Sequence, residues 1–397
     1  MSWDFKKLGE VTELQGGSQP PKSKFKYEEA EGYLRLLQIR DFKSDDRAVF
    51  IPKSKKNRLC YENDILIGRY GASVGKICTG KKGAYNVALM KATPDKELLN
   101  TRLYLYYLKS KLFQDELASV SSRSAQNGFS KDDIKDFIVP IPPISEQKQI
   151  VETLDKAFEK IDKAIANAEQ NLQNAKELFE SYLQNIFENK GNDWEEKPIK
   201  DLTKIVTKGS SPKWQGVNYV DEGGIFFLTS KNVGEGELLL KNKKYIEEKF
   251  NEIQKKTILK KGDVLTNIVG ASIGRTAIFN LDEITNVNQA VCLMRCNSEK
   301  VYNYYLMYLL NSPFFKSILH DNEVDNARAN LSLTFFKNLV IPLPKFEVQK
   351  EIVFKIKSFL EETKKLKAIY TQKIADLEEL KKSILEKAFK GELTSAA

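Results

Sequence analysis

Two long segments of the chain carry apolar residues at the spacing of an extended amphipathic helix. In residues 146–190 these positions are separated, after the first turn, alternately by three and four residues: Ile150, Leu154, Phe158, Ile161, Ile165, Ala168, Leu172, Ala175, Phe179, Tyr182 and Ile186. In residues 346–397 the positions in register are Ile356, Leu360, Tyr370, Ile374, Leu377 and Ile384. This alternation is the heptad pattern of a coiled coil. Each segment therefore predicts a helix of about 40 residues, roughly 60 Å long.

The second helical segment departs from the strict heptad. Polar residues occupy three of its expected apolar positions: Thr363, Lys367 and Lys381. Leu366 and Leu380 lie one residue before the two lysines, so the sequence leaves open which residues face the partner helix.

The remaining segments, residues 1–145 and 191–345, have the mixed pattern of an α/β (α+β) fold. Short β-branched runs such as Ile65–Ile67 are bounded by residues that favour turns, as strands are. Tyr104–Leu117 and Tyr304–Leu319 each predict one amphipathic helix rich in Tyr, Leu and Phe. Each segment then ends in a Pro-containing run, which predicts an extended strand because proline lacks an amide donor and disfavours helix at the preceding residue.

The two halves of the chain are copies of one another. Gly71-Ala-Ser-Val-Gly-Lys76 recurs as Gly270-Ala-Ser-Ile-Gly-Arg275. From about residue 105 to 187 the matched positions differ by 202, as Tyr106 and Tyr308 do, and need no gap. The earlier part of each copy needs small gaps. The sequence therefore contains one fixed and one variable part in each copy.

A duplicated module with a helix predicts a symmetric pairing of the two helices. One such helix cannot bury its own apolar stripe, but two on one chain can bury each other's. Duplicated units tend to pair about a pseudo-twofold axis, which makes the helices antiparallel. We expect globular domains at residues 1–145 and 191–345, separated by long antiparallel coiled-coil helices at 146–190 and 346–397. The alternative is a coiled coil that binds an unrelated partner or dimerises between chains.

Composition argues against an enzyme. The chain has one histidine, His320, and four scattered cysteines, which is too few for a local zinc site or a histidine-based catalytic triad. Gly71–Lys76 is one residue short of a phosphate-binding loop, so we read it as a tight turn between strands that presents a cation. We therefore expect a binding protein without catalytic residues, cofactor or metal. With no apolar run of membrane-spanning length and no signal core, we expect it to be cytoplasmic.

The charge is basic and unevenly distributed. The formal net charge is +9, of which residues 1–145 carry +7 and residues 146–190 carry −3. Residues 191–345 carry +3 and the tail +2. The globular segments are therefore basic, which favours a polyanionic partner.

The order of these motifs, and their double occurrence, resembles the specificity subunit of type I restriction–modification systems. The resemblance covers essentially the whole chain and includes the ending Ala388-Phe-Lys-Gly-Glu-Leu393. It implies two target-recognition domains that read a bipartite, asymmetric site in double-stranded DNA. It further implies that the helices hold the domains apart and bind two methyltransferase (modification) subunits, which bring S-adenosylmethionine, and that restriction/translocase subunits join the complex.

Candidate DNA-binding residues follow from the repeat. Cations at equivalent places in both copies are candidates for phosphate contacts: Lys22 and Lys213, Arg40 and Lys231, Lys76 and Arg275. Polar residues that differ between the copies are candidates for reading bases: Gln19, Arg69, Arg123, Gln126, Asn127, Asn267, Arg328 and Asn330. Trp214 shares these properties, but we expect it to fill a small local core. For each cation the alternative is an ordinary solvated side chain.

A second function remains compatible with the sequence. A non-enzymatic coiled-coil adaptor or an RNA-binding protein would also have basic modules on a long helical pair. Such a protein would bind nucleic acid non-specifically, and its affinity would fall steeply with salt.

Overall fold

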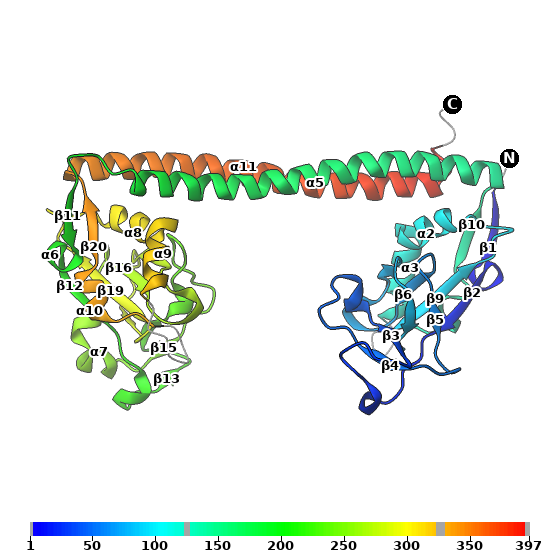
Figure 1. Cartoon of the computed structure of the whole chain (residues 1–397), viewed down its shortest axis with the longest axis horizontal. Helices are drawn as coiled ribbons and strands as arrows, with labels where there is room; N and C mark the ends of the chain where they lie inside the picture. Colours follow the sequence, from blue (N-terminus) through cyan, green and yellow to red (C-terminus); the bar gives the residue numbers. More distant parts are fainter. Residues whose placement is uncertain (1–2, 123–127, 323–329, 394–397) are drawn as a thin grey trace. The chain divides into compact units, whose positions relative to one another are not determined.

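The chain folds into two compact units (Figure 1). The computed structural model describes three stretches of sequence: residues 3–122, 128–322 and 330–393. Unit 1 contains Met1–Ala168 and Gln372–Ala397, and unit 2 contains Glu169–Thr371. Each unit therefore consists of one globular module and a part of each long helix, α5 (Ile144–Glu188) and α11 (Phe346–Phe389).

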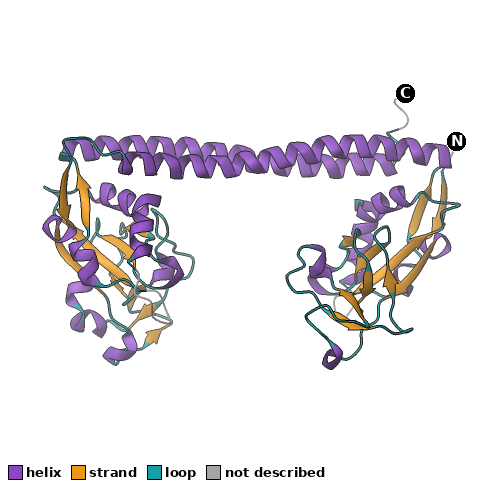
Figure 2. Ribbon diagram, viewed as in Figure 1, coloured by secondary structure: helices purple, strands orange, loops and turns teal. Residues whose placement is uncertain are grey.

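The described part of the module in unit 1 contains three small sheets (Figure 2). The first is antiparallel and has the order β2 (Thr12–Gly16), β9 (Leu89–Pro94), β6 (Ile65–Gly68) and β7 (Ile77–Cys78). The second has the order β4 (Phe50–Pro52), β3 (Tyr33–Leu37), β8 (Gly83–Tyr85) and β5 (Leu59–Cys60), with β3 and β8 parallel. The third pairs β1 (Asp4–Lys7) with β10 (Ile138–Ile141). Pro140 lies in this two-stranded sheet, where a missing amide donor is tolerated.

The module in unit 2 repeats the order of the antiparallel sheet, whereas its mixed sheet has the parallel pair at one edge rather than in the centre. Its antiparallel sheet has the order β12 (Thr203–Lys208), β19 (Val291–Cys296), β16 (Val264–Asn267) and β17 (Thr276–Ile278). Its mixed sheet has the order β13 (Tyr219–Val220), β15 (Tyr245–Ile246), β14 (Ile225–Leu228) and β18 (Thr285–Val287), with β14 and β18 parallel. The strand β11 (Glu195–Pro198) pairs with β20 (Val340–Leu343).

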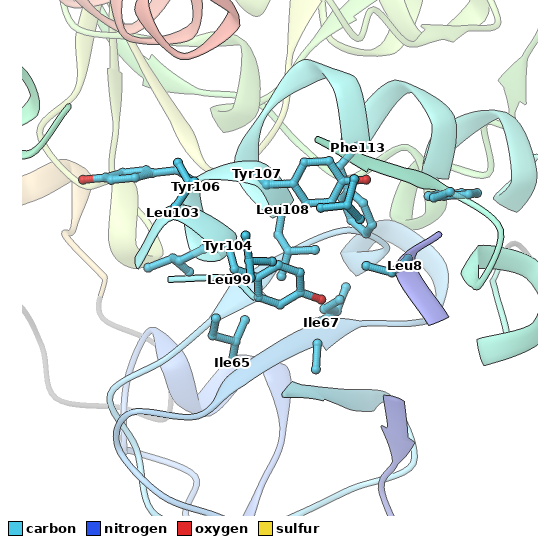
Figure 3. Close-up of a cluster of buried hydrophobic side chains, with 14 of the residues drawn as sticks. Leu8, Ile65, Ile67, Leu99, Leu103, Tyr104, Tyr106, Tyr107, Leu108 and Phe113 are labelled. Atoms are coloured by element: carbon cyan, nitrogen blue, oxygen red, sulfur yellow. The ribbon is translucent and has the colours of Figure 1, made fainter. Parts of the chain in front are cut away.

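A helix rich in tyrosine and leucine forms the centre of each module's core. In unit 1, α2 (Thr101–Lys109) is capped by Asn100, whose side chain accepts hydrogen bonds from two backbone amides at the start of the helix. Tyr104 and Tyr107 are buried in the same cluster as Ile65 and Ile67 of β6 (Figure 3). The corresponding helix of unit 2 is α8 (Asn303–Asn311). Burial of these large side chains is the main apolar contribution to each module.

The sequence-based prediction of one helix at Tyr104–Leu117 and at Tyr304–Leu319 is wrong in one respect. A serine divides each into two helices: α2 and α3 (Lys111–Ser121), and α8 and α9 (Pro313–Asp321). Ser110 and Ser312 are buried, and each hydroxyl donates to the carbonyl three residues before it. This hydrogen bond satisfies the end of one helix and turns the chain into the next.

The long helices pair in the predicted antiparallel sense within each unit. In unit 1 the early part of α5 lies against the late part of α11, where Lys381 Nζ is 2.5 Å from Asp162 Oδ1 and 5.0 Å from the Phe158 ring. In unit 2 the late part of α5 lies against the early part of α11, where the ring centroids of Tyr182 and Phe359 are 4.4 Å apart. The predicted fold class, two α/β modules with long antiparallel coiled-coil helices, is confirmed.

The polar interruptions of the heptad in α11 stay in the helix–helix seam. Thr363 is 2% exposed, and its hydroxyl donates to the carbonyl of Phe359 in the preceding turn. By contrast, Leu366 is 40% exposed and Leu380 is 47% exposed. The seam therefore continues through the polar residues, and the two leucines lie on the outer surface of the pair.

A buried glutamine connects the start of α5 to the module of unit 1. Gln147 is 0% exposed, and its Oε1 accepts a hydrogen bond from the backbone amide of Asn100 at 2.7 Å. Its Nε2 donates to the carbonyls of Leu98 at 2.9 Å and Pro142 at 2.8 Å. One side chain thereby joins the helix cap of α2, the exit strand and the long helix.

Unit 2 contains the same connection. Gln349 is also 0% exposed and accepts a hydrogen bond from the amide of Tyr302 at 2.8 Å. It donates to the carbonyls of Lys300 at 3.2 Å and Pro344 at 2.9 Å. The two glutamines lie 202 positions apart, so this connection belongs to the fixed part of the repeat.

Replacing Gln147 by leucine should destabilise unit 1. The substitution keeps the volume but leaves one backbone amide and two carbonyls without their partner, which should lower the free energy of unfolding by about 3 kcal/mol. Urea unfolding of the full chain, followed by circular dichroism, measures this change. Gln149→Leu is the matched control, because Gln149 is exposed in the same helical turn. Equal effects of the two substitutions would contradict the role given to Gln147.

Candidate nucleic-acid interface

In each module a glycine packs the polar loop that follows the first strand of the antiparallel sheet against a neighbouring turn. A Cβ atom on Gly17 would lie 2.0 Å from the carbonyl oxygen of Asn86, and one on Gly209 would lie 1.7 Å from that of Val287. A larger residue at either position would force the loop away from the turn after β8 or β18. The glycines therefore fix where the candidate residues that follow them begin.

The turns that these glycines contact contain a repeated asparagine that the sequence analysis missed. Asn86 Oδ1 accepts a hydrogen bond from the amide of Ala88 at 3.2 Å, and Asn288 Oδ1 accepts one from the amide of Ala290 at 3.1 Å. Both asparagines precede an alanine by two residues and lie 202 positions apart. This spacing was the available signal for a fixed turn at the site.

The predicted glycine turn between two strands is present in both modules. It joins β6 to β7 in unit 1 and β16 to β17 in unit 2. In unit 1 it is closed by backbone hydrogen bonds between Gly68 and both Gly75 and Lys76. The turn presents Lys76, which is half-buried, and in unit 2 Arg275, which is exposed.

Arg69 links three loops of unit 1. Its Nε donates to the carbonyl of Phe129 at 3.2 Å and its Nη1 to the carbonyl of Val87 at 3.4 Å. The guanidinium also lies 5.0 Å from the centroid of the Tyr70 ring. Arg69 is half-buried, and Val87 and Tyr70 beside it are exposed. The structure thus brings the glycine turn, the asparagine turn and the segment after residue 127 together.

Asn267 does not have the exposure that a base-contacting residue needs. It is 0% exposed, and its Nδ2 donates to the carbonyl of Ser230 at 2.9 Å and to Ser272 Oγ at 3.1 Å. Asn267 has the position of Gly68 in the repeat. The amide of Gly68 donates to the carbonyl of Lys76, and the amide of Asn267 donates to the carbonyl of the equivalent Arg275. The counterpart of Arg69 is Ile268, which is also buried. The prediction that Asn267 reads a base is therefore corrected: its side chain joins two loops.

Most of the proposed phosphate-binding cations are exposed on short turns. Lys22 lies in η1 (Lys22–Lys24), Arg40 in η2 (Ile39–Phe42), Lys213 in η4 (Pro212–Gln215) and Lys231 in η5 (Ser230–Asn232). All four are exposed, as is Gln19 before the first turn. Each turn follows a strand or a loop held by glycine, so the backbone beneath each cation is fixed.

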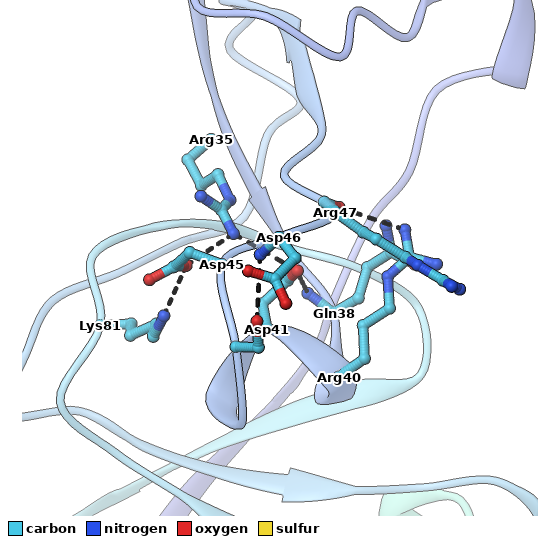
Figure 4. Close-up of polar contacts among 9 residues, drawn as sticks. Arg35, Gln38, Arg40, Asp41, Asp45, Asp46, Arg47 and Lys81 are labelled. Atoms are coloured by element: carbon cyan, nitrogen blue, oxygen red, sulfur yellow. Dashed lines mark hydrogen bonds and ion pairs between the residues drawn. The ribbon is translucent and has the colours of Figure 1, made fainter. Parts of the chain in front are cut away.

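A buried acid holds the turn that carries Arg40 (Figure 4). Asp41 is 0% exposed and accepts a hydrogen bond from the amide of Gln38 at 2.6 Å. Its carboxylate lies 3.3 Å from the guanidinium of Arg35, which also pairs with Asp45 at 2.8 Å. The acid is thus neutralised inside the loop, while Arg40 points to the surface.

Unit 2 uses an amide at the equivalent place. Asn232 is 3% exposed, accepts a hydrogen bond from the amide of Thr229 at 3.0 Å and donates to the carbonyl of Leu239 at 3.0 Å. Because this cap is neutral, it needs no buried cation. Lys231 therefore projects from a turn of the same shape in a different electrostatic setting.

Four of the predicted base readers lie outside the described residues: Arg123, Gln126, Asn127 and Arg328. The described residues that follow these gaps are Gly128, which forms a backbone bridge with Tyr70, and Asn330, which forms one with Val269. Both segments therefore begin next to the glycine turns. Asn330 itself is half-buried.

The expectation that Trp214 fills a small local core is wrong. Its residue is 74% exposed, on the turn η4 next to Lys213.

The buried cysteines are not suited to nucleophilic chemistry. Burial raises the pKa of the Cys60 thiol to about 11 and that of Cys292 to about 12, so both are protonated at neutral pH. Within residues 3–122, 128–322 and 330–393, no group of three or more His, Cys, Asp or Glu side chains could hold a metal ion. In the same stretches no helix has the length and apolar content needed to cross a lipid bilayer.

Replacing Asn267 by alanine should reduce stability. The substitution removes the hydrogen bonds from Asn267 Nδ2 to the carbonyls of Ser230 and Val233 and to Ser272 Oγ, and it opens a small space between two loops, at a cost of about 2 kcal/mol in the free energy of unfolding. Thermal unfolding of the full chain measures this cost. Asn218→Ala is the control, because Asn218 is an exposed asparagine of the same module. Unchanged stability of the Asn267 variant would contradict this role.

Known proteins share both the sequence pattern and the fold. The family model for the type I restriction modification DNA specificity domain matches residues 1–172 and 191–378. The MjaVIII specificity subunit of Methanocaldococcus jannaschii is 26% identical over 372 residues, which cover 90% of this chain and 85% of that one. The EcoBI specificity subunit of Escherichia coli is 25% identical over 91% of this chain and 80% of its own length.

Solved structures of low identity have the same fold. A chain from a structure on the assembly and conformational transition of the type I R-M system has 17% identity and a TM-score of 0.76, with 98% of both chains covered. The HsdS subunit from Thermoanaerobacter tengcongensis has 17% identity and a TM-score of 0.55, with 98% and 97% covered. The family model covers most of the sequence, including both copies of the repeat. This chain therefore belongs to the type I restriction–modification DNA specificity family.

Proposed function

We propose that this chain reads a bipartite, asymmetric sequence in double-stranded DNA, with one half-site for each module. The observation that carries the proposal is that the two modules share one framework but present different side chains on it. Arg69 of unit 1 corresponds to the buried Ile268 of unit 2, and Ser23 corresponds to Trp214. Different side chains on one framework would read different bases.

Each segment of the chain would then have its own role in DNA recognition. Residues 1–145 and 191–345 would be the target-recognition domains, and residues 146–190 and 346–397 the spacer helices. Exposed cations of both modules would contact phosphates and set the orientation on the duplex. The residues that would reach base edges are Gln19, Arg69, Arg123, Gln126, Asn127, Arg328 and Asn330. These roles, unlike the family, are inferred from position and exposure.

The long helices would bind the partner subunits. Four apolar residues of unit 2 are exposed on the outside of the helical pair: Leu178 at 53%, Phe354 at 75%, Leu366 at 40% and Ile369 at 59%. Apolar side chains of this exposure on a helix surface are typical of a protein-binding face. We infer that two methyltransferase subunits bind the helices, bring S-adenosylmethionine and perform the chemistry, and that restriction/translocase subunits join them. The chain itself would then be a non-catalytic subunit, working in the cytoplasm.

The central experiment is to map methylated adenines across the genome of a strain that carries this gene with its modification subunits. We expect one bipartite motif, with an unread gap, to be methylated, and the motif to disappear when the gene is deleted. Exchanging residues 191–345 for those of a relative should change one half of the motif and preserve the other. An unchanged methylation pattern in the deletion strain would overturn the proposal.

The spacer role predicts the effect of lengthening both helices. One heptad inserted between Ala168 and Glu169 and another between Thr371 and Gln372, where each helix passes from one unit to the other, would preserve the apolar seam. The added residues extend each helix by about 10 Å, so the methylated motif should keep both half-sites and gain about three base pairs of gap. The same genome-wide mapping measures this change, with a heptad inserted in α5 alone as the control that disrupts the register. Altered half-sites with an unchanged gap would contradict the spacer role.

A further inference from the structure

The most exposed tryptophan of the chain lies on a turn whose backbone is fixed. Trp214 is 74% exposed, whereas the other two tryptophans of the chain are half-buried. Its amide donates to the carbonyl of Ser211 at 3.1 Å, and the amide of Val217 donates to the carbonyl of Pro212 at 3.0 Å. Gly216, with a φ of 65°, ends the turn in the left-handed region. The exposed indole is therefore carried by a turn whose backbone is held by hydrogen bonds.

The segment that carries Trp214 is basic, and the nearest acid that bonds to it, Glu247, accepts from the amide of Asn218 at 3.0 Å. Residues 208–219 contain two lysines and no acidic residue. Lys213 precedes Trp214 directly and is exposed. The segment starts at Gly209, which lies against the asparagine turn at the candidate interface. The indole thus belongs to the same loop cluster as the proposed phosphate contacts of unit 2.

A second exposed apolar residue of the module shows what an ordinary surface position looks like here. Ile284 is 64% exposed, but it directly follows Asp282 and Glu283. Asp282 is paired with Lys261 and Glu283 with Lys243, so the charges beside Ile284 balance, whereas Lys213 beside Trp214 is exposed. Exposure alone therefore does not distinguish Trp214; its combination with neighbouring cations and a fixed turn does.

We propose that Trp214 inserts its indole at a base step of the half-site bound by unit 2 and stacks there on a base. This inference rests on the proposed function. Insertion of an apolar side chain unstacks a base step and kinks the duplex. The neighbouring cation would offset the repulsion between phosphates that the kink brings closer together. Unit 1 has Ser23 at the equivalent position, so only the half-site of unit 2 would be unstacked.

The ordered turn explains why such a contact would be effective. A flexible loop would lose backbone freedom when its indole enters the stack, whereas the hydrogen bonds of η4 already restrict the backbone of this turn. Stacking on an aromatic side chain depends little on base identity, since every base has a π-face. Trp214 would therefore position the half-site and favour an easily unstacked step, while polar neighbours read the bases.

The test uses the full chain in complex with its modification subunits and duplexes that contain the methylated motif. Single 2-aminopurine substitutions scan the half-site of unit 2 and its flanks, because the fluorescence of this base rises when it is unstacked. We expect one position to brighten several-fold with the wild-type complex, to stay dark with Trp214→Ala and to brighten with Trp214→Phe. We also expect Trp214→Ala to raise the KM for DNA roughly 10- to 100-fold, the range of one lost base stack.

Ile284→Ala is the matched control, since it removes another strongly exposed apolar side chain from the same module. Its KM and its 2-aminopurine signals should equal those of the wild type. Thermal unfolding of each variant checks that the module is intact. If Trp214→Ala fails to fold, the wild-type and Trp214→Phe scans still decide the matter, because insertion requires a bright position with both.

The outcomes separate this inference from the proposed function. A wild-type complex that methylates no defined motif overturns the proposed function. A wild-type complex that methylates its motif without any bright position, or a Trp214→Ala variant with wild-type KM, overturns the role of Trp214 alone. Loss of complex assembly in Trp214→Ala, with normal folding, would assign the indole to a protein partner and would also overturn it.

Discussion

The whole arrangement depends on one buried side chain at the start of each long helix. Gln147 and Gln349 each satisfy three backbone groups, two just before the core helix of the module and one just before the long helix, without contact with water. An apolar contact at this place would tolerate small rotations, because it is not directional. Three hydrogen bonds at fixed angles tolerate far less. Each module is thereby oriented on its own part of the helical pair, and the variable loops can change without altering that orientation.

The two modules also show how a fixed framework accommodates different sequence. At the base of the glycine turn, unit 1 has Gly68, where a Cβ atom would lie 2.1 Å from the carbonyl oxygen of Ser73. Unit 2 has Asn267 there, whose side-chain amide donates to the carbonyl of Ser230. A position without room for a side chain in one copy thus holds a hydrogen-bonded side chain in the other. The buried caps Asp41 and Asn232 are exchanged in the same manner, with charge compensation only where charge is present.

Periodicity was sufficient to predict the fold, because both helices and the duplication leave signals at fixed spacings. The same reasoning failed where the deciding contact is local: Ser110 and Ser312 end a helix through a hydrogen bond that apolar spacing does not record. For the interface, equivalent position in the repeat predicted exposed cations such as Arg40 and Lys231. It did not predict the burial of Asn267 or the exposure of Trp214, since burial depends on which loops pack together. The repeated asparagines were visible in the sequence, but their backbone role is recognisable only once the turn is known.

Unit 1 is assembled from both ends of the chain, whereas unit 2 is one continuous stretch. During synthesis on the ribosome, every residue of unit 2 has been made while the closing segment of unit 1, from Gln372 onward, is still missing. Until then the apolar face of α5 around Phe158 and Ile161 lacks the late part of α11, whose Leu385 belongs to the same buried cluster. Unit 1 is therefore the first unit to enter translation and the last to be completed. A nascent chain would expose this face for the time needed to translate about 200 residues, at the rate of ordinary protein synthesis.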